Sequence, residues 1–176
     1  PVYCRKGGDH PSAKVFPIER ATRHLSMYDP AANKWTLVST CFPTHHLIFA
    51  EDANSTLWTS RGVGGVGVVG WLNRKLYEET GDEERAQGWT PLILDTNGNG
   101  KRDEWVDPAQ PLDPKKDKRV AAGFYGVAVN PGDGSVWGSV LGFPGPVVRL
   151  TPGANPTETG LIEVFELPWD NQGLAV

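Results

Sequence analysis

Two stretches of the sequence decide the expected fold: HLIFAEDANSTLWTS at residues 46–60 and YGVAVNPGDGSVWGS at residues 125–139. Each consists of an apolar run, a polar turn and a second run that ends in Trp-x-Ser, with Trp58 and Trp137 in the same place. Short apolar or aromatic runs bounded by Gly, Pro, Asn and Asp predict antiparallel strands joined by turns. Because the whole unit recurs, we expect a repeat architecture.

A second pair of stretches extends the repeat. LSMYDPAAN at residues 25–33 matches VVRLTPGAN at residues 147–155, and a further β-type run follows each, at residues 34–39 and 161–167. The combined order is strand, turn, strand with Trp, glycine-rich loop, strand, proline turn and strand, which corresponds to the four antiparallel strands of one propeller blade. We therefore predict an all-β protein, a β-propeller segment of about two and a half four-stranded blades.

The spacing of the repeat suggests how the chain is divided. Trp58 and Trp137 are 79 residues apart, which fits two blades of ~40 residues or one blade with a long insertion. We favour the insertion, because residues 78–120 contain one clear hairpin and much polar loop. The chain then comprises an N-terminal loop with the outer strands of an incomplete blade (1–44), a blade with an inserted loop (45–120) and a blade with a C-terminal loop (121–176). Since propellers close with roughly four to eight blades, we expect a fragment of a larger ring.

The rest of the chain adds a few local expectations. Further strands are expected at residues 66–71, 91–94, 104–106 and 124–129, and the best helix candidate is the short acidic stretch 73–85. The glycine-rich stretch 62–67 lacks the Lys-Ser/Thr of a phosphate-binding loop, so we expect it to link two strands. The lysine-rich run at residues 115–119 is expected to be a solvated loop.

The strongest local signal for chemistry is DTNGNGKRD at residues 95–103. It fits the pattern D-x-[DN]-x-[DN]-G-x-x-D, in which oxygen-bearing side chains at alternate positions converge on a hard cation. The predicted ligands are the side chains of Asp95, Asn97, Asn99 and Asp103, together with the backbone carbonyl of Lys101. The loop lies between two expected strands and resembles the nine-residue calcium loops of integrin-type propellers.

Two other interpretations compete with this calcium loop. An EF-hand is disfavoured because its twelfth position is Val106 in place of the bidentate Glu, and no helices are expected on either side. A plain Asn-Gly turn is the competing interpretation, since Asn-Gly is a common hairpin turn. With only Asp95 and Asp103 charged, we expect a weak site of the extracellular type.

Residues 133–137 (DGSVW), 147–153 (VVRLTPG) and 162–168 (IEVFELP) together resemble the streptogramin (virginiamycin B) lyase-like and NHL-type propellers. Residues 54–59 (NSTLWT) form a looser copy, and the resemblance spans 25–168 with an interruption at 78–120. It is specific for blade architecture and weak for activity, because related propellers include lyases, lactonases and proteins without known chemistry.

Two functions follow from these features. The first is a calcium-stabilised, non-catalytic propeller module that binds a ligand or a protein partner at one face of the ring. The second is a propeller enzyme of the lyase or lactonase type, because the resemblance implies a channel in which His and Glu hold a divalent metal. His45 and His46, at the start of an inner strand, are the candidate catalytic residues. Neighbouring strand residues point to opposite faces, so at most one of the two would face the channel, and a hydrogen-bonded structural histidine is the alternative.

The cysteines and the charge limit the setting. Cys4 and Cys41 fit one disulfide in a secreted or periplasmic protein. Two unrelated buried thiols are the alternative, and a catalytic dyad of Cys41 with His45 is less favoured. The net charge of −4 and a pI near 5.5 leave no basic surface for a nucleic acid backbone. No apolar run approaches the ~18 residues of a membrane span.

Overall fold

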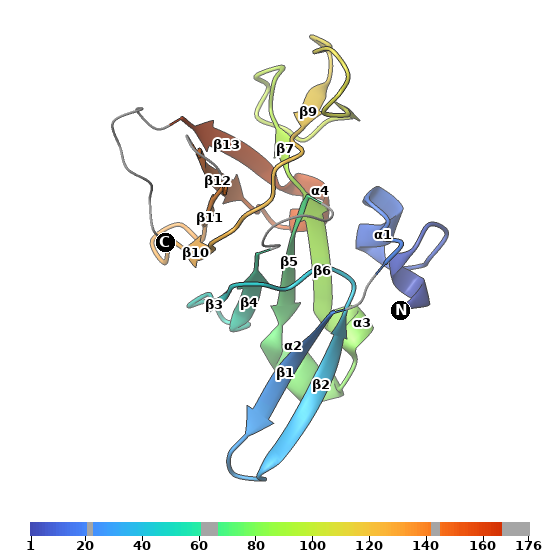
Figure 1. The fold of residues 1–176 in the computed structure, drawn as a ribbon, viewed down its shortest axis with the longest axis vertical. Helices are drawn as coiled ribbons and strands as arrows, with labels where there is room; N and C mark the ends of the chain where they lie inside the picture. Colours follow the sequence, from blue (N-terminus) through green and yellow to red (C-terminus); the bar gives the residue numbers. More distant parts are fainter. Residues whose placement is uncertain (21–22, 61–66, 142–144, 167–176) are drawn as a thin grey trace.

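The structure is a computed structural model that describes residues 1–20, 23–60, 67–141 and 145–166 (Figure 1). Strands dominate it, and most of them pair in antiparallel fashion, which confirms the predicted all-β class at this level. The described residues form no closed ring of blades. In chain order the elements are η1 (Val2–Cys4), α1 (Pro11–Val15), β1 (Arg23–Asp29), β2 (Lys34–Thr40), β3 (Leu47–Phe49), β4 (Thr56–Thr59), β5 (Val68–Asn73), α2 (Arg74–Thr80), α3 (Glu83–Ala86), β6 (Gln87–Pro91), β7 (Ile93–Leu94), β8 (Trp105–Val106), β9 (Asp117–Arg119), β10 (Ala128–Val129), β11 (Val136–Ser139), β12 (Val147–Thr151), α4 (Pro156–Thr159) and β13 (Leu161–Phe165).

The first repeated stretch forms the beginning of a four-stranded antiparallel sheet, β3-β4-β5-β6. Its strands follow one another in sequence order, and α2 and α3 lie in the connection between β5 and β6. All four side chains of β4 are buried, and Trp58 on β4 lies opposite Trp71 on β5 with ring centroids 5.4 Å apart. The glycine-rich stretch before β5 lies outside the described residues except for Gly67.

The second repeated stretch begins an equivalent antiparallel series, β10-β11-β12-β13. The two hairpins differ by one residue in register: Trp58 pairs with Ile48, whereas Trp137 pairs with Ala128 instead of Val127. The turns explain the difference, because one is closed between Ala50 and Thr56 and the other between Asn130 and Ser135. One residue fewer in the second turn moves the pairing by one position along the strand.

The segment between these two series forms an additional lobe of short strands. β7 runs parallel to β13 at Leu94 and Ile162, so it continues the second sheet, and the order beyond it is β7-β9-β8. The expected strands at 91–94 and 104–106 therefore do not pair with each other, because β9 lies between them. The prediction of a solvated loop at 115–119 is wrong for Asp117–Arg119, because these residues form β9 and pair with β7 and β8.

A separate two-stranded hairpin, β1-β2, projects from the body of the protein (Figure 1). It corresponds to the incomplete first unit of the repeat. The aromatic rings of Tyr28 and Trp35 lie 4.8 Å apart near its tip, and the hydroxyl of Tyr28 donates to Asn33 Oδ1. Tyr28, Trp35 and Leu37 are exposed, whereas Leu25 and Val38 of the same hairpin are buried in a cluster with residues of the first sheet and α3.

The acidic stretch predicted as a helix forms two short helices, α2 and α3. Asn73 caps α2 by accepting the amide N–H of Leu76, and Asp82 caps α3 by accepting that of Arg85. Gly81 ends α2 with a φ of +67°, a left-handed conformation that glycine adopts without strain. These helices connect β5 to β6 at the lower end of the first sheet (Figure 1).

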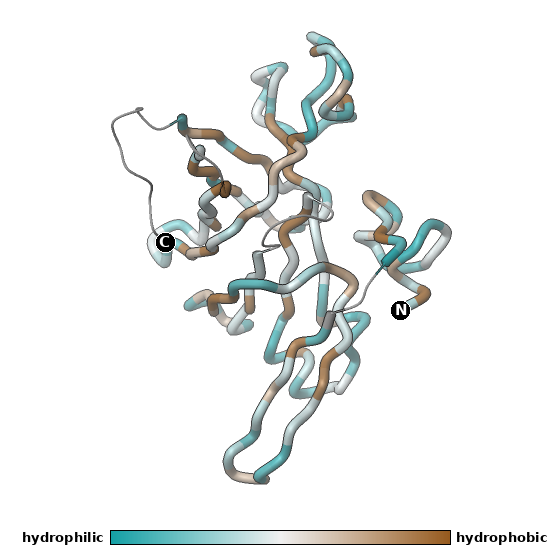
Figure 2. The backbone as a smooth tube through the Cα atoms, in the orientation of Figure 1, coloured by the Kyte–Doolittle hydropathy of each residue, from teal (hydrophilic) through white to brown (hydrophobic). Residues whose placement is uncertain are grey.

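The two four-stranded series share one hydrophobic core. Trp58 and Val69 of the first sheet pack in the same cluster as Phe124, Val136 and Ile162 of the second. Figure 2 shows that apolar residues recur along the strands where these sheets face each other, while the connecting turns are hydrophilic. Gly138 permits close packing here, because a Cβ at this position would lie 2.1 Å from the ring of Phe124.

Candidate functional site

The predicted calcium loop is folded around its own side-chain oxygens. Asp95 follows β7, and its Oδ1 and Oδ2 accept the backbone N–H groups of Gly98 and Gly100, at 2.7 and 2.8 Å. Gly98 and Gly100 have positive φ values of 74° and 72°, which turn the chain tightly around this carboxylate. Asp95 is therefore the organising residue of the loop.

The two asparagines and Asp103 complete the loop. Asn97 Oδ1 and Asn99 Oδ1 accept the N–H groups of Asn99 and Lys101, and both side-chain amides donate to Asp103 Oδ2, at 2.9 and 2.6 Å. These amide hydrogen bonds are the main reason that the pKa of Asp103 lies below its usual value. Direct hydrogen bonds thus link Asn97, Asn99, Lys101 and Asp103 to one another, whereas Asp95 bonds the backbone of the two loop glycines.

Asp117 is a further acidic residue at this loop that the sequence reasoning missed. It is fully buried on β9, and its Oδ2 accepts the backbone N–H of Asp103 at 2.8 Å. Its Oδ1 is buried without a hydrogen-bond partner. Burial raises the pKa of the Asp117 carboxyl, and the nearby carboxylates of Asp95 and Asp103 act in the same direction. Its place in a lysine-rich run hid it, and no spacing signal in the sequence connects it with the loop.

Arg102 belongs to the same loop, but its side chain makes its contacts outside the loop. Its Nη1 donates to Thr90 Oγ1 at 2.7 Å and lies within hydrogen-bonding distance of the carbonyls of Pro156 and Gly160, and its guanidinium lies over the ring of Trp105. Burial lowers the pKa of this guanidinium to about 10, although Asp117 favours its charged form. Arg102 therefore anchors the loop to β6 and to the end of α4.

The chemistry of the loop suits a hard cation. All of its candidate ligands are carboxylate, amide or backbone oxygens, the donors that calcium prefers. In the part of the chain that the structure describes, no group of three or more His, Cys, Asp or Glu side chains is arranged to hold a metal ion. The acidic oxygens of the loop instead accept hydrogen bonds from loop amides, so binding would require some of these bonds to be rearranged or shared.

The two candidate catalytic histidines lie together at the edge where the two sheets meet. Both precede β3, so strand alternation does not apply, and both side chains are exposed; the expectation that they face opposite sides is wrong. Their Nδ1 atoms are 3.3 Å apart, and His46 Nδ1 lies 2.7 Å from the backbone carbonyl of Tyr125. The Tyr125 ring lies 5.1 Å from each imidazole. The equivalent starts of the two repeated units therefore form one exposed cluster.

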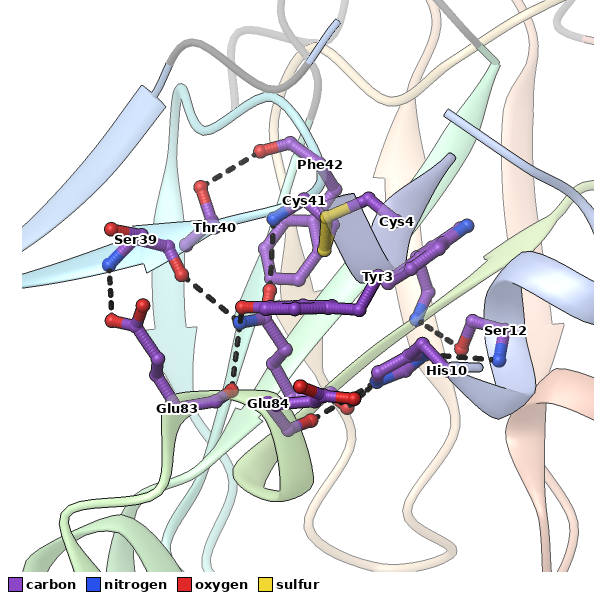
Figure 3. Close-up of a disulfide and its surroundings, with 12 residues drawn as sticks. Tyr3, Cys4, His10, Ser12, Ser39, Thr40, Cys41, Phe42, Glu83 and Glu84 are labelled. Carbon is purple, nitrogen blue, oxygen red and sulfur yellow. Dashed lines mark hydrogen bonds between the residues drawn. A yellow bond between two sulfur atoms is a disulfide. The ribbon is translucent and has the colours of Figure 1, made fainter. Parts of the chain in front are cut away.

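The two cysteines are joined in a disulfide that fixes the N-terminal segment to the end of β2 (Figure 3). Cys41 consequently has no free thiol for a dyad with His45. Around the disulfide, Gln87 Oε1 accepts the N–H of Cys41, and Glu83 Oε2 accepts the N–H of Ser39. Burial raises the pKa of Tyr3 to about 12, with Glu83 as the second cause. Cys4, Cys41 and Phe42 are buried here, so the region is closely packed around the disulfide.

A cleft of about 550 Å³ opens between the two sheets on the side of their hairpin turns. Trp58 and Trp71 line it from the first sheet, and Asn130 and Asp133 line it from the second. Asp52 also lines the cleft, and its Oδ1 accepts the N–H groups of Asn54 and Thr56, so its carboxylate shapes the turn. The cleft combines an aromatic wall with an acidic and amide rim.

None of the helices in the described ranges is long and apolar enough to cross a membrane. No family model, no curated protein and no solved structure matches the chain.

Proposed function

We propose that the chain is a secreted or periplasmic β-propeller module that is stabilised by calcium and binds a ligand or protein partner. The observation that carries the proposal is the pair of consecutive antiparallel series, β3-β4-β5-β6 and β10-β11-β12-β13. Both grow from the same strand-turn-Trp-x-Ser unit, and they pack on one core. Repeated four-stranded sheets that pack face to face are the building blocks of propellers.

The first strands of the two antiparallel series, β3 and β10, define the inner edge of the proposed module. β3 and β10 are edge strands of their sheets, and the residues before them meet at His46 and Tyr125. In a propeller the first strand of each blade lines the central channel, so this edge corresponds to the channel side. The segment 92–123 is then an insertion between two blades, and the cation loop belongs to this insertion.

Calcium is supported by the donor set of the loop. Five consecutive alternate positions offer oxygen ligands, from Asp95 to Asp103, and the loop already folds around them. The disulfide between Cys4 and Cys41 supports an oxidising compartment. Millimolar calcium is available outside the cytosol, where a weak site of this kind would be occupied.

The cleft between the two sheets is the proposed ligand-binding face. Its aromatic wall includes Trp71, and its rim includes Glu51, Asp52 and Asp133. Flat aromatic surfaces beside hydrogen-bonding groups suit a polar small molecule or a protein side chain. The chemistry of the rim favours a neutral or cationic ligand.

Thermal unfolding with and without calcium tests the metal part of this proposal. We expect calcium to raise the Tm, EDTA to reverse the rise, and Asp95→Ala to abolish it. Asp113→Ala is the matched control, because Asp113 also accepts a turn amide, from Lys115, but lies outside the loop. A wild-type Tm that is identical in calcium and in EDTA would reduce the loop to a plain turn.

An experimental structure tests the blade interpretation. We expect the two sheets to be related by rotation about a common axis on the side of β3 and β10. A closed barrel, or two sheets that stack as a sandwich without such an axis, would contradict the propeller assignment.

A second function is favoured by the cluster of His45, His46 and Tyr125. Two imidazoles beside a phenol are able to hold a divalent metal or to act as a base, as a lyase or lactonase of the propeller type requires. Hydrolysis of simple lactones or ring opening of a streptogramin, measured with added divalent metals, is the direct test. Loss of such activity in His45→Ala and His46→Ala would support an enzymatic function. A wild-type protein that is inactive with every divalent metal tested would count against it.

A further inference from the structure

The position of Asp117 places its carboxyl group at the base of the cation loop. The loop leaves the end of β7 and returns into β8, and β9 lies between these two strands. Leu94 pairs with Lys118, so one step further along the antiparallel register Asp95 comes opposite Asp117. On the other side Asp117 pairs with Trp105, two residues after Asp103. Asp117 therefore lies between the first and the last ligand of the loop.

One oxygen of this carboxyl group accepts a direct hydrogen bond from the loop, whereas the other makes no direct hydrogen bond. The backbone N–H of Thr96 lies close enough to favour the charged form of the group. Oδ2 accepts the N–H of Asp103 at 2.8 Å, whereas Oδ1 is buried without a hydrogen bond, and the whole residue is 0% exposed. A buried polar atom without a direct partner destabilises the fold, and more so when its group is charged. Native proteins keep such atoms rarely, and often for an ion or a catalytic role.

We propose that Asp117 is a third carboxylate ligand of the calcium ion, with its Oδ1 coordinating the ion alongside oxygens of Asp95 and Asp103. This inference rests on the proposed calcium function of the loop. It adds to the ligand set a residue outside 95–103, on a strand that the fold brings next to the loop.

Coordination chemistry favours the additional ligand. Calcium takes six to eight oxygens, and the loop itself offers the side chains of Asp95, Asn97, Asn99 and Asp103 with the carbonyl of Lys101. Asp117 supplies a sixth residue and raises the negative charge of the ligand set from two to three. More carboxylates bind calcium more tightly, so the site should be stronger than the loop sequence alone suggests.

Arg102 is the competing partner for Asp117. Its Nη2 is also buried without a hydrogen bond, and the Asp117 charge acts on it. No ion pair joins the two side chains, and the other terminal nitrogen of the guanidinium, Nη1, donates to Thr90 Oγ1 and lies near the Gly160 carbonyl that follows α4. If Asp117 served only Arg102, its loss would destabilise the fold to the same extent with and without calcium.

The test compares three proteins by calorimetric calcium titration and by Tm in calcium and in EDTA: wild type, Asp117→Asn and Glu104→Gln. Asp117→Asn keeps the shape of the side chain and removes its charge. Glu104→Gln removes the same charge next to Asp103, from a side chain that is 84% exposed and pairs with Lys116. We expect Asp117→Asn to weaken calcium affinity by at least ~10-fold and to lose most of the calcium-induced Tm rise, and Glu104→Gln to change affinity less than about threefold.

Each outcome separates the two proposals. Calcium binding by the wild type with unchanged affinity in Asp117→Asn would overturn the role of Asp117 and leave the loop site intact. An equal loss of affinity in both variants would indicate a general charge effect and would also overturn it. Absence of calcium binding by the wild type would overturn the calcium function itself, and the role of Asp117 with it.

A measurement on the wild type covers the case in which Asp117→Asn does not fold. With aspartate labelled at the side-chain carboxyl carbon with ¹³C, calcium addition should shift three carboxyl signals, which saturate together at one equivalent. A shift of only two signals, those of Asp95 and Asp103, would overturn the proposal.

Discussion

The imidazole of His10 stacks on the indole of Trp89, with ring centroids 4.6 Å apart and an angle of 16° between the planes. The contact joins the N-terminal segment to β6, the last strand of the first sheet. His10 Nδ1 accepts the N–H of Ser12 at the start of α1, and Nε2 faces the carbonyls of Glu84 and Gln87. The ring is therefore held as the neutral form with its proton on Nε2.

His10 should make stability depend on pH in a defined direction. Burial lowers its pKa below 6.5, so the unfolded chain binds a proton at a higher pH than the folded chain. The stabilising contribution is complete above pH 6.5 and is lost as the pH falls through this value, because a proton on Nδ1 would face the N–H of Ser12. Chemical denaturation between pH 5 and 8 measures this slope.

His10→Gln should flatten that slope between pH 5 and 6.5. The exposed His24 offers the control, because His24→Gln should leave the slope as in the wild type. An equal slope in wild type and His10→Gln would exclude His10 as its source.

Reduction of the disulfide should destabilise the protein substantially. Cys4 and Cys41 are separated by 37 residues, and closing a loop of this length stabilises the folded state by about 3–4 kcal/mol on the chain-entropy model. The paired variant Cys4→Ser/Cys41→Ser should show this loss in urea denaturation. The intact protein should have a mass two hydrogens below that of the reduced protein and should not react with iodoacetamide while it is folded.

The two repeated tryptophans should differ in their importance for stability. Trp58 is 5% exposed inside the shared core, whereas Trp137 is half-buried and stacks on Phe165 at the side of the second sheet. Trp58→Ala should cost about 3–5 kcal/mol, and Trp137→Ala clearly less. Equal losses in denaturant titrations would mean that the difference in register has no effect on packing.

The close approach at Gly138 predicts a strong effect of a single methyl group. Gly138→Ala should cost about 1–3 kcal/mol, because the added Cβ overlaps the buried Phe124 ring. The double variant Gly138→Ala/Phe124→Leu should be less destabilised than the two single losses combined, which a double-mutant cycle measures. Gly132→Ala is the control, since its nearest neighbour is the exposed Asn130 amide oxygen, and it should change stability by less than about 0.5 kcal/mol.

Local patterns predicted the local elements of this fold. The runs around Trp58 and Trp137 and the hairpin of residues 25–39 alternate apolar and turn residues strongly enough to identify strands, and the structure places strands in all of them. Asn73, Gly81 and Asp82 likewise delimit the two short helices. Each of these signals acts over a few neighbouring residues, which is the range that a sequence pattern reports.

Pairing between distant segments could not be predicted in the same way. β9 consists of Asp117, Lys118 and Arg119, a composition typical of solvent-exposed loops. It forms a strand because it pairs with β7 on one side and with β8 on the other. Asp117 is buried on this strand, so no local pattern in the sequence indicates its place beside the loop. The predicted ligands from Asp95 to Asp103, in contrast, could be proposed from the sequence because their regular spacing is itself the signal.

The single parallel contact between Leu94 and Ile162 makes the loop lobe continuous with the second sheet. Leu94 directly precedes Asp95, so the backbone that carries the first loop ligand also shares a ladder with β13. A conformational change at the loop would therefore be transmitted through one strand pairing to the sheet that forms one wall of the cleft. Amide hydrogen exchange in β13 would slow on cation uptake even though no residue of that strand contacts the ion.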